Sequence, residues 1–99
     1  MSDVAEMAAR LEGVRCIDPG KLAQWRYHGR IVARQLDDEH IVIRADFDYR
    51  DLLLRQFPDT FSVPNRFAKH MMVVANLAAD AGAIEDALVA AWELQHNAD

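Results

Sequence analysis

Residues Trp25–Arg44, which read WRYHGRIVARQLDDEHIVIR, carry the clearest structural pattern of the chain. Apolar and polar side chains alternate along most of this stretch, and such alternation is typical of strands with one buried face. Gly29 and the acidic run Asp37–Glu39 interrupt the alternation and indicate turns. The stretch therefore predicts three antiparallel strands in a meander.

The register of these strands decides which side chains share a face. We expect a three-residue hairpin loop in which Gly29 is left-handed, so that Arg26 lies across from Arg30. One face is then apolar and is expected to pack on the core: Trp25, Ile31, Ala33, Ile41 and Ile43. The other face is basic and is expected to meet solvent: Arg26, His28, Arg30, Arg34, His40 and Arg44.

The flanking segments carry helical periodicity. Apolar side chains recur at helical spacing in residues 1–12, and two further helices are expected from about residue 48 to 56 and from 80 to 95. The residues expected to cap or end them are Ser2 and Gly13 for the first helix, Asp46 or Asp48 for the second, and Asp80 for the third.

The remaining segments complete the layout of the chain. Residues 60–63 and 70–77 favour strands, residues 64–68 a loop, and Asp18–Gly20 a turn. Helices covering one face of an antiparallel sheet define the α+β class. We find no linker or repeat, so residues 1–99 are expected to form one domain.

Composition limits the classes of protein to consider. The chain has 99 residues, 52% hydrophobic and 27% charged, which fits an ordinary folded domain rather than a disordered segment. No apolar run approaches the roughly 20 residues of a membrane span. The single cysteine, Cys16, cannot form an internal disulfide, which favours a cytoplasmic location. A net charge of −5 counts against a strong nucleic-acid binder.

Basic residues are nevertheless concentrated locally. No acidic side chain occurs between Pro19 and Leu36, where four cations lie. Arginines on a two-stranded ribbon can contact phosphates, and a second, smaller basic site follows near residue 67. The candidate nucleic-acid-binding residues are Arg26, His28, Arg30, Arg34, Arg44, Arg66 and Lys69. The alternative is an ordinary solvated sheet face, partly neutralised by Asp37–Glu39.

The sequence gives no indication of catalysis, a metal or a cofactor. None of the four histidines is paired with another histidine or a cysteine at metal-binding spacing. No nucleophile elbow and no phosphate-binding glycine loop occurs. We therefore expect a non-enzymatic protein without metal or cofactor.

Four landmarks, in this order and spacing, resemble the MmcQ/YjbR-like family of small bacterial proteins. The resemblance covers about residues 13–94. The landmarks are the hairpin Trp25–Arg30, the strand-to-helix stretch Ile41–Leu53, the segment Phe57–Phe61 with Val63–Pro64, and the strand Met72–Val74 with the closing helix through Ala91–Leu94. The chain departs from the family pattern at Lys69–Met71, where a Gly and a Pro often precede the last strand.

The resemblance implies an α+β fold similar to that of frataxin-like proteins. It also implies DNA binding by a double-wing arrangement of hairpins, with contacts to phosphates. The alternative is a non-catalytic module that binds a protein or small ligand, as a homodimer, through the same sheet face or the Phe61–Phe67 loop. Phe67 is a candidate exposed aromatic in that loop, beside Arg66 and Lys69.

Overall fold

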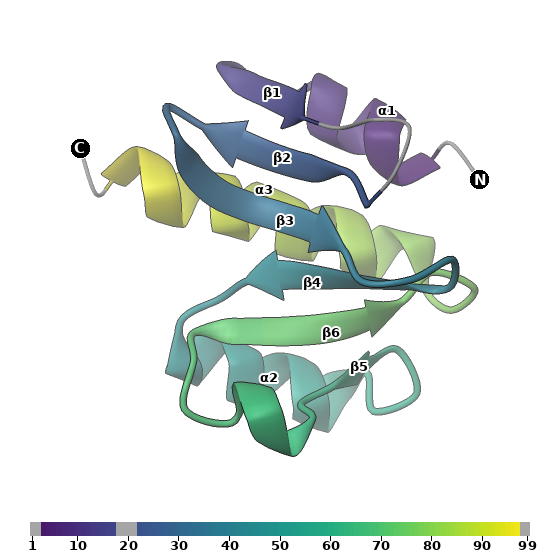
Figure 1. Cartoon of the computed structure of the whole chain (residues 1–99). Coiled ribbons are helices and arrows are strands. Elements are labelled where there is room, and N and C mark those ends of the chain that lie inside the picture. Colours follow the sequence, from purple (N-terminus) through teal and green to yellow (C-terminus); the bar gives the residue numbers. More distant parts are fainter. Residues whose placement is uncertain (1–2, 18–21, 98–99) are drawn as a thin grey trace.

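The computed structural model describes residues 3–17 and 22–97 and shows a six-stranded antiparallel sheet with helices packed on one face (Figure 1). The α+β class is confirmed. In chain order the elements are α1 (Asp3–Ala9), β1 (Val14–Ile17), β2 (Gln24–Tyr27), β3 (Arg30–Gln35), β4 (His40–Arg44), α2 (Phe47–Gln56), β5 (Phe61–Ser62), the 3₁₀ turn η1 (Asn65–Phe67), β6 (Met72–Asn76) and α3 (Ala81–Asn97).

The strands are arranged in the order β1-β2-β3-β4-β6-β5. The first four form the expected meander with one strand added in front. After β4 the chain passes through α2 to the edge strand β5 and returns as β6, between β5 and β4. Strand β1 was not predicted. Three of its four residues are exposed, so it lacks the alternation that marks a half-buried strand.

The hydrophobic core lies between the sheet and the three helices. Helix α3 crosses behind β3 and β4, and α2 lies behind β5 and β6 (Figure 1). Apolar side chains from the strands and from α3 are fully buried there, as is usual for large apolar residues. The largest of them are Phe61, Ile41, Ile43, Ile84, Leu88, Val32 and Val73.

The predicted caps of the two longer helices are confirmed. Asp46 Oδ1 accepts a hydrogen bond of 2.8 Å from the Tyr49 backbone N–H at the start of α2. At the start of α3, Asp80 Oδ1 accepts one of 3.0 Å from Ala83. These bonds satisfy backbone donors that a helix start leaves unpaired, so each cap fixes where its helix begins.

Helix α1 is shorter than predicted: it ends at Ala9, whereas the sequence pattern predicted a helix to residue 12. The chain continues in tight turns, in which the Leu11 N–H donates to the Ala8 carbonyl and the Val14 N–H to the Leu11 carbonyl. Gly13 then adopts a φ of +81° and directs the chain into β1. The predicted cap Ser2 and the predicted turn at residues 18–20 lie outside the described residues. No helix in the described part of the chain is long and apolar enough to cross a membrane.

Two glycines with nearly equal φ angles provide a test of the packing. An added Cβ at Gly13 would lie 2.7 Å from Cε1 of the buried Tyr27 ring, whereas one at Gly29 would meet nothing within 4 Å. Gly29→Ala should therefore cost only the backbone penalty, about 1 kcal/mol. Gly13→Ala adds overpacking and should cost about 2–4 kcal/mol of unfolding free energy. Urea unfolding measures both, and equal losses would contradict the close approach to Tyr27.

Candidate nucleic-acid interface

Four arginines share the sheet face that points away from the helices. In the antiparallel register Arg15 of β1 lies opposite Arg26 of β2, and Gln24 lies opposite Arg34 of β3. Opposed residues point to the same side of a sheet, and so do residues two apart on one strand. Since Arg34 also lies opposite Val42, two residues before Arg44, the open face carries all four. Arg15 was not predicted to belong to this face because β1 was not predicted.

The prediction that Arg30 belongs to this face is wrong. The hairpin turn has two residues, His28 and Gly29, with φ of +50° and +83°. Positive φ at both positions is what a type I′ turn requires. Tyr27 therefore lies opposite Arg30, and the strands differ in register from the predicted three-residue loop. A one-residue change of register sends a side chain to the other face.

The side chain of Arg30 accordingly lies on the helix side. Its Nη1 donates to the Gln95 carbonyl near the end of α3, at 3.4 Å. The two-residue turn puts Ile31, rather than Arg30, opposite Arg26, and a β-bulge beyond this pair puts Ala33 opposite Trp25. Ile31 was predicted to lie on the core face, and this register places it among the arginines of the open face.

His28 lies at the tip of the hairpin. It is exposed, and its ring stacks on Tyr27 with centroids 4.0 Å apart. Tyr27 is buried on the helix side, where its ring also meets Trp92 with centroids 6.2 Å apart. This stacking holds the His28 ring toward the helix layer and away from the arginines of the open face.

The turn η1 lies over the far half of the open face. Phe67 is only 8% exposed and packs on Val42 and Val74, so the expectation of an exposed aromatic is wrong. The guanidinium carbons of Arg34 and Arg66 lie 5.9 and 4.8 Å from its ring centroid, within cation–π range. This contact joins η1 to the arginines of the sheet. Lys69 is exposed in the next turn.

Arg50 of α2 holds this second basic segment in place. Its guanidinium donates to the carbonyls of His70 at 2.8 Å, Ala68 at 3.2 Å and Phe67 at 3.4 Å. One planar fork thus satisfies three carbonyls of the turn that carries Arg66 and Lys69. The sequence shows an arginine in this helix but no local pattern that assigns it this role.

The arginines of the open face have no acidic partner among the residues that the structure describes. Within residues 3–17 and 22–97, the ion pairs are Arg10–Glu85 and Asp37–His40. Arg26 is held by neutral groups, since its Nε donates to Gln24 Oε1 at 3.0 Å and its Nη1 to the Gly29 carbonyl at 2.8 Å. The Nε of Arg44 is buried and makes no hydrogen bond. Within the described ranges, no carboxylate pairs with the positive charges of this face.

The acidic β3–β4 turn forms no ion pair with these arginines in the described part of the chain. Asp37 Oδ1 accepts from the Glu39 backbone N–H at 2.8 Å and lies 2.9 Å from His40 Nδ1. The Glu39 hydrogen bond, and then His40, lower the pKa of the Asp37 carboxyl. This carboxylate is engaged within its own turn.

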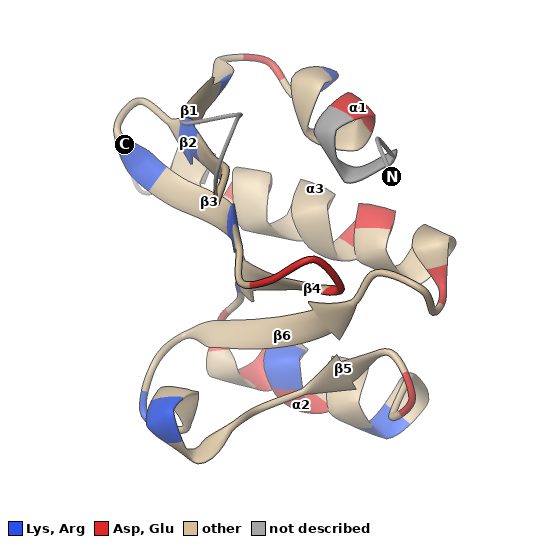
Figure 2. Cartoon of the chain, turned by 45° about the vertical axis from the view of Figure 1, so that its right-hand side comes forward, with Lys and Arg blue, Asp and Glu red and all other residues tan. Residues whose placement is uncertain are grey.

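Figure 2 shows acidic segments on α1, α3 and this turn, and basic segments on the hairpin and η1.

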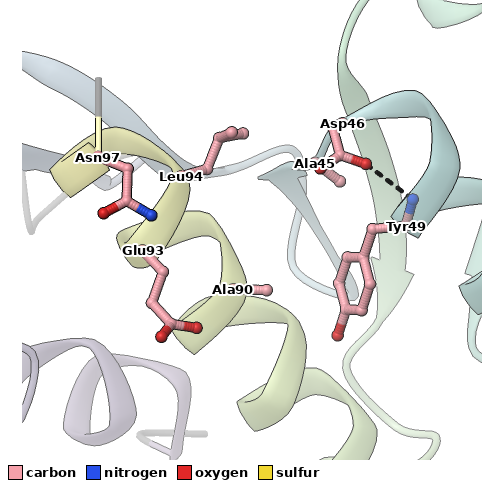
Figure 3. Close-up of a pocket in the computed structure, with 7 residues that line it drawn as sticks. All are labelled: Ala45, Asp46, Tyr49, Ala90, Glu93, Leu94 and Asn97. Atoms are coloured by element: carbon pink, nitrogen blue, oxygen red, sulfur yellow. Dashed lines mark hydrogen bonds between the residues drawn. The ribbon is translucent and has the colours of Figure 1, made fainter.

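A cavity of about 260 Å³ opens on the helix side, between the start of α2 and the end of α3 (Figure 3). Its lining contains two carboxylates and no cation, which makes it unsuited to a phosphate. Burial, followed by the charge of Asp86, raises the pKa of the Tyr49 phenol at its wall. The lining residues are Ala45, Asp46, Tyr49, Ala90, Glu93, Leu94 and Asn97.

Metal-binding geometry does not occur among the described residues. No group of three or more His, Cys, Asp or Glu side chains there is placed to hold a metal ion. His40 is engaged with Asp37, and His96 lies beside Tyr27 and Trp92 at ring-centroid distances of 5.6 and 5.3 Å. Both histidines therefore make contacts with neighbouring side chains of the fold.

The fold and the site together define an α+β protein with one basic, open sheet face. Compared with protein-family models, curated proteins and solved structures, the chain matches none of them.

The Arg50 fork can be tested with a conservative change. Lysine keeps the charge but cannot donate to three carbonyls in the same fixed geometry. Arg50→Lys should lower the unfolding free energy by about 1–2 kcal/mol and speed amide hydrogen exchange at Ala68, His70 and Met72. Arg55→Lys, one turn further along the same helix and exposed, is the matched control. Unchanged exchange in Arg50→Lys would contradict this role.

Proposed function

We propose that this protein is a non-catalytic DNA-binding protein that contacts phosphates through the open face of its sheet. The observation that supports the proposal is the set of open-face arginines, none of which pairs with a carboxylate in residues 3–17 and 22–97. Arginine presents a planar fork of donors that suits phosphate oxygens, and its charge releases counterions when it binds a phosphate. The proposed contact residues are Arg15, Arg26, Arg34, Arg44, Arg66 and Lys69.

Two earlier candidates are not part of the proposed surface. Arg30 is bonded to the end of α3, and His28 stacks on Tyr27. Arg15 takes their place because β1 brings it beside Arg26. The revised surface joins two basic segments, the hairpin side and η1, through the contact of Arg34 with Phe67.

The distribution of charge reconciles this proposal with a net charge of −5. The acidic residues of α1 and α3 lie on the helix side, and basic segments lie on the hairpin and η1 (Figure 2). A negative total weakens long-range attraction to DNA, because distant charges add up at large separation. At contact distance the local charge dominates, since salt screens charges beyond about 8 Å at physiological ionic strength.

Membership of the MmcQ/YjbR-like family and a frataxin-like fold are part of the same proposal. An order of one helix, a meander, a helix, two strands and a closing helix is compatible with that resemblance. In a double-wing arrangement the hairpin β2–β3 would serve as one wing, and η1 with Lys69 as the other.

A homodimer formed through the free edge of β1 is the second candidate. The observation in its favour is the exposure of Ile17 (42%) and Leu22 (53%) near this edge. Antiparallel pairing of β1 with a second copy would, however, bring two Arg15 side chains close together on one face. Like charges on neighbouring strands are destabilising. DNA binding by the open face is therefore the better-supported function.

The proposal predicts salt-dependent binding that is lost with the open-face arginines. A short duplex DNA should bind at low salt, and four or five phosphate contacts give a slope of log K against log salt near about −4. Arg34→Gln combined with Arg44→Gln should weaken binding by on the order of tenfold or more, and flatten the slope by about 2. Fluorescence anisotropy of a labelled duplex measures both quantities.

The matched control removes the same charge from the helix side. Arg10→Gln combined with Arg55→Gln changes two exposed arginines away from the open face and should leave affinity nearly unchanged. Circular dichroism establishes that both double variants are folded. Equal losses in the two variants, or no binding by the wild type at low salt, would exclude the proposed interface.

A further inference from the structure

We infer that the open face follows the sugar–phosphate backbone of duplex DNA at right angles to the strands, and that it does not read bases. This inference rests on the proposed DNA binding and specifies the form of DNA and the path of its backbone. It assigns the start of that path to Arg15, on the edge strand β1. The path continues through Arg26 to Arg44, and Arg34 lies beside it, two residues away along the strands.

The strand register sets the direction of the cation path. Arg15 and Arg26 are directly opposed on neighbouring strands, and Arg44 lies two strands further, on β4. With a spacing of about 4.8 Å between strands, the path from β1 to β4 covers roughly 14 Å. A duplex carries one phosphate per strand for about every 3.4 Å of axis, and the backbone winds around that axis, so a backbone path of this length passes roughly three phosphates.

The opposed pair Arg15–Arg26 is the strongest local indication of an anion. Like charges directly across two antiparallel strands destabilise the sheet. Arg26 is held in position by Gln24 and the Gly29 carbonyl, whereas Arg15 is exposed and has no described partner. A phosphate between the two guanidinium groups would remove the repulsion. Arg15, which is exposed, and Arg26, which is held in place, can therefore bind one backbone phosphate between them.

The described residues of this face offer no aromatic surface to a base. Trp25, Tyr27 and Phe61 are buried in the core on the helix side. Phe67 is the aromatic packed on the open face, and it is buried under contacts with Arg34 and Arg66. Proteins that bind single strands obtain much of their affinity from bases stacked on aromatic side chains. The described part of this face lacks that means of binding.

Duplex DNA is therefore the preferred ligand. Its density of phosphates and condensed counterions is higher than that of a single strand, so each neutralised phosphate contributes more to binding. Contacts restricted to phosphates carry no sequence information. The face should favour duplex over single strand and treat unrelated duplex sequences alike.

The test compares two unrelated duplexes with one of their single strands, using wild type and Arg15→Gln. We expect wild type to bind both duplexes with affinities within about twofold of each other, and several-fold more tightly than the single strand. Arg15→Gln should weaken duplex binding by about fivefold to tenfold and flatten the salt slope by about 1. The control Arg55→Gln makes the same charge change on α2 and should leave both values unchanged.

The outcomes separate this inference from the function on which it rests. Tighter binding of the single strand, or a strong preference for one duplex sequence, would overturn it while leaving DNA binding intact. Equal binding by Arg15→Gln and wild type, alongside a loss in the Arg34 and Arg44 double variant, would remove β1 from the path. No binding of any DNA by the wild type would instead exclude the proposed function itself.

Discussion

The two-residue turn at His28–Gly29 controls much of the rest of this structure. Both residues hold positive φ, so β2 and β3 are joined with Tyr27 opposite Arg30. This register puts Tyr27 and Arg30 on the helix side, where they meet the end of α3. It leaves Arg26 on the open face beside Arg15. A loop longer by one residue would pair Arg26 with Arg30 and put Arg30 on the open face, because side chains alternate with a period of two.

The two sides of the sheet differ in what covers them, and therefore in the side chains that they carry. The helix side is a packed apolar core with acidic residues on the outer surface of its helices, whereas the open side carries arginines on β1 to β4. Helices cover only one side, so the other side needs no continuous apolar surface. Where η1 does cover it, a small second cluster forms from Val42, Phe67 and Val74. The arginines occupy the uncovered part, where their charges remain accessible to a ligand.

Much of the fold was predictable because its signals are local. The acidic caps Asp46 and Asp80 and the alternation in β3 and β4 depend on neighbours in the chain. Strand β1 was not predicted because its residues do not alternate between buried and exposed. It is a strand because it pairs with β2. Arg34 and Arg44 were correctly placed on one face, since they lie in strands of clear alternation. Arg30 and Phe67 were misplaced, because a turn length and a distant contact decide their positions.

The amino-acid pattern alone was enough to predict the α+β class, the meander, the starts of the two longer helices and the presence of several arginines near one hairpin. Periodicity and capping are properties of a few consecutive residues, so they are visible in the chain. Tertiary structure decided which of those arginines lie together. Register brought Arg15 to the open face and removed Arg30, and the Arg50 fork fixed the turn that holds Arg66. The register and these contacts depend on interactions between residues far apart in the chain. A local sequence pattern does not contain the energies of those interactions.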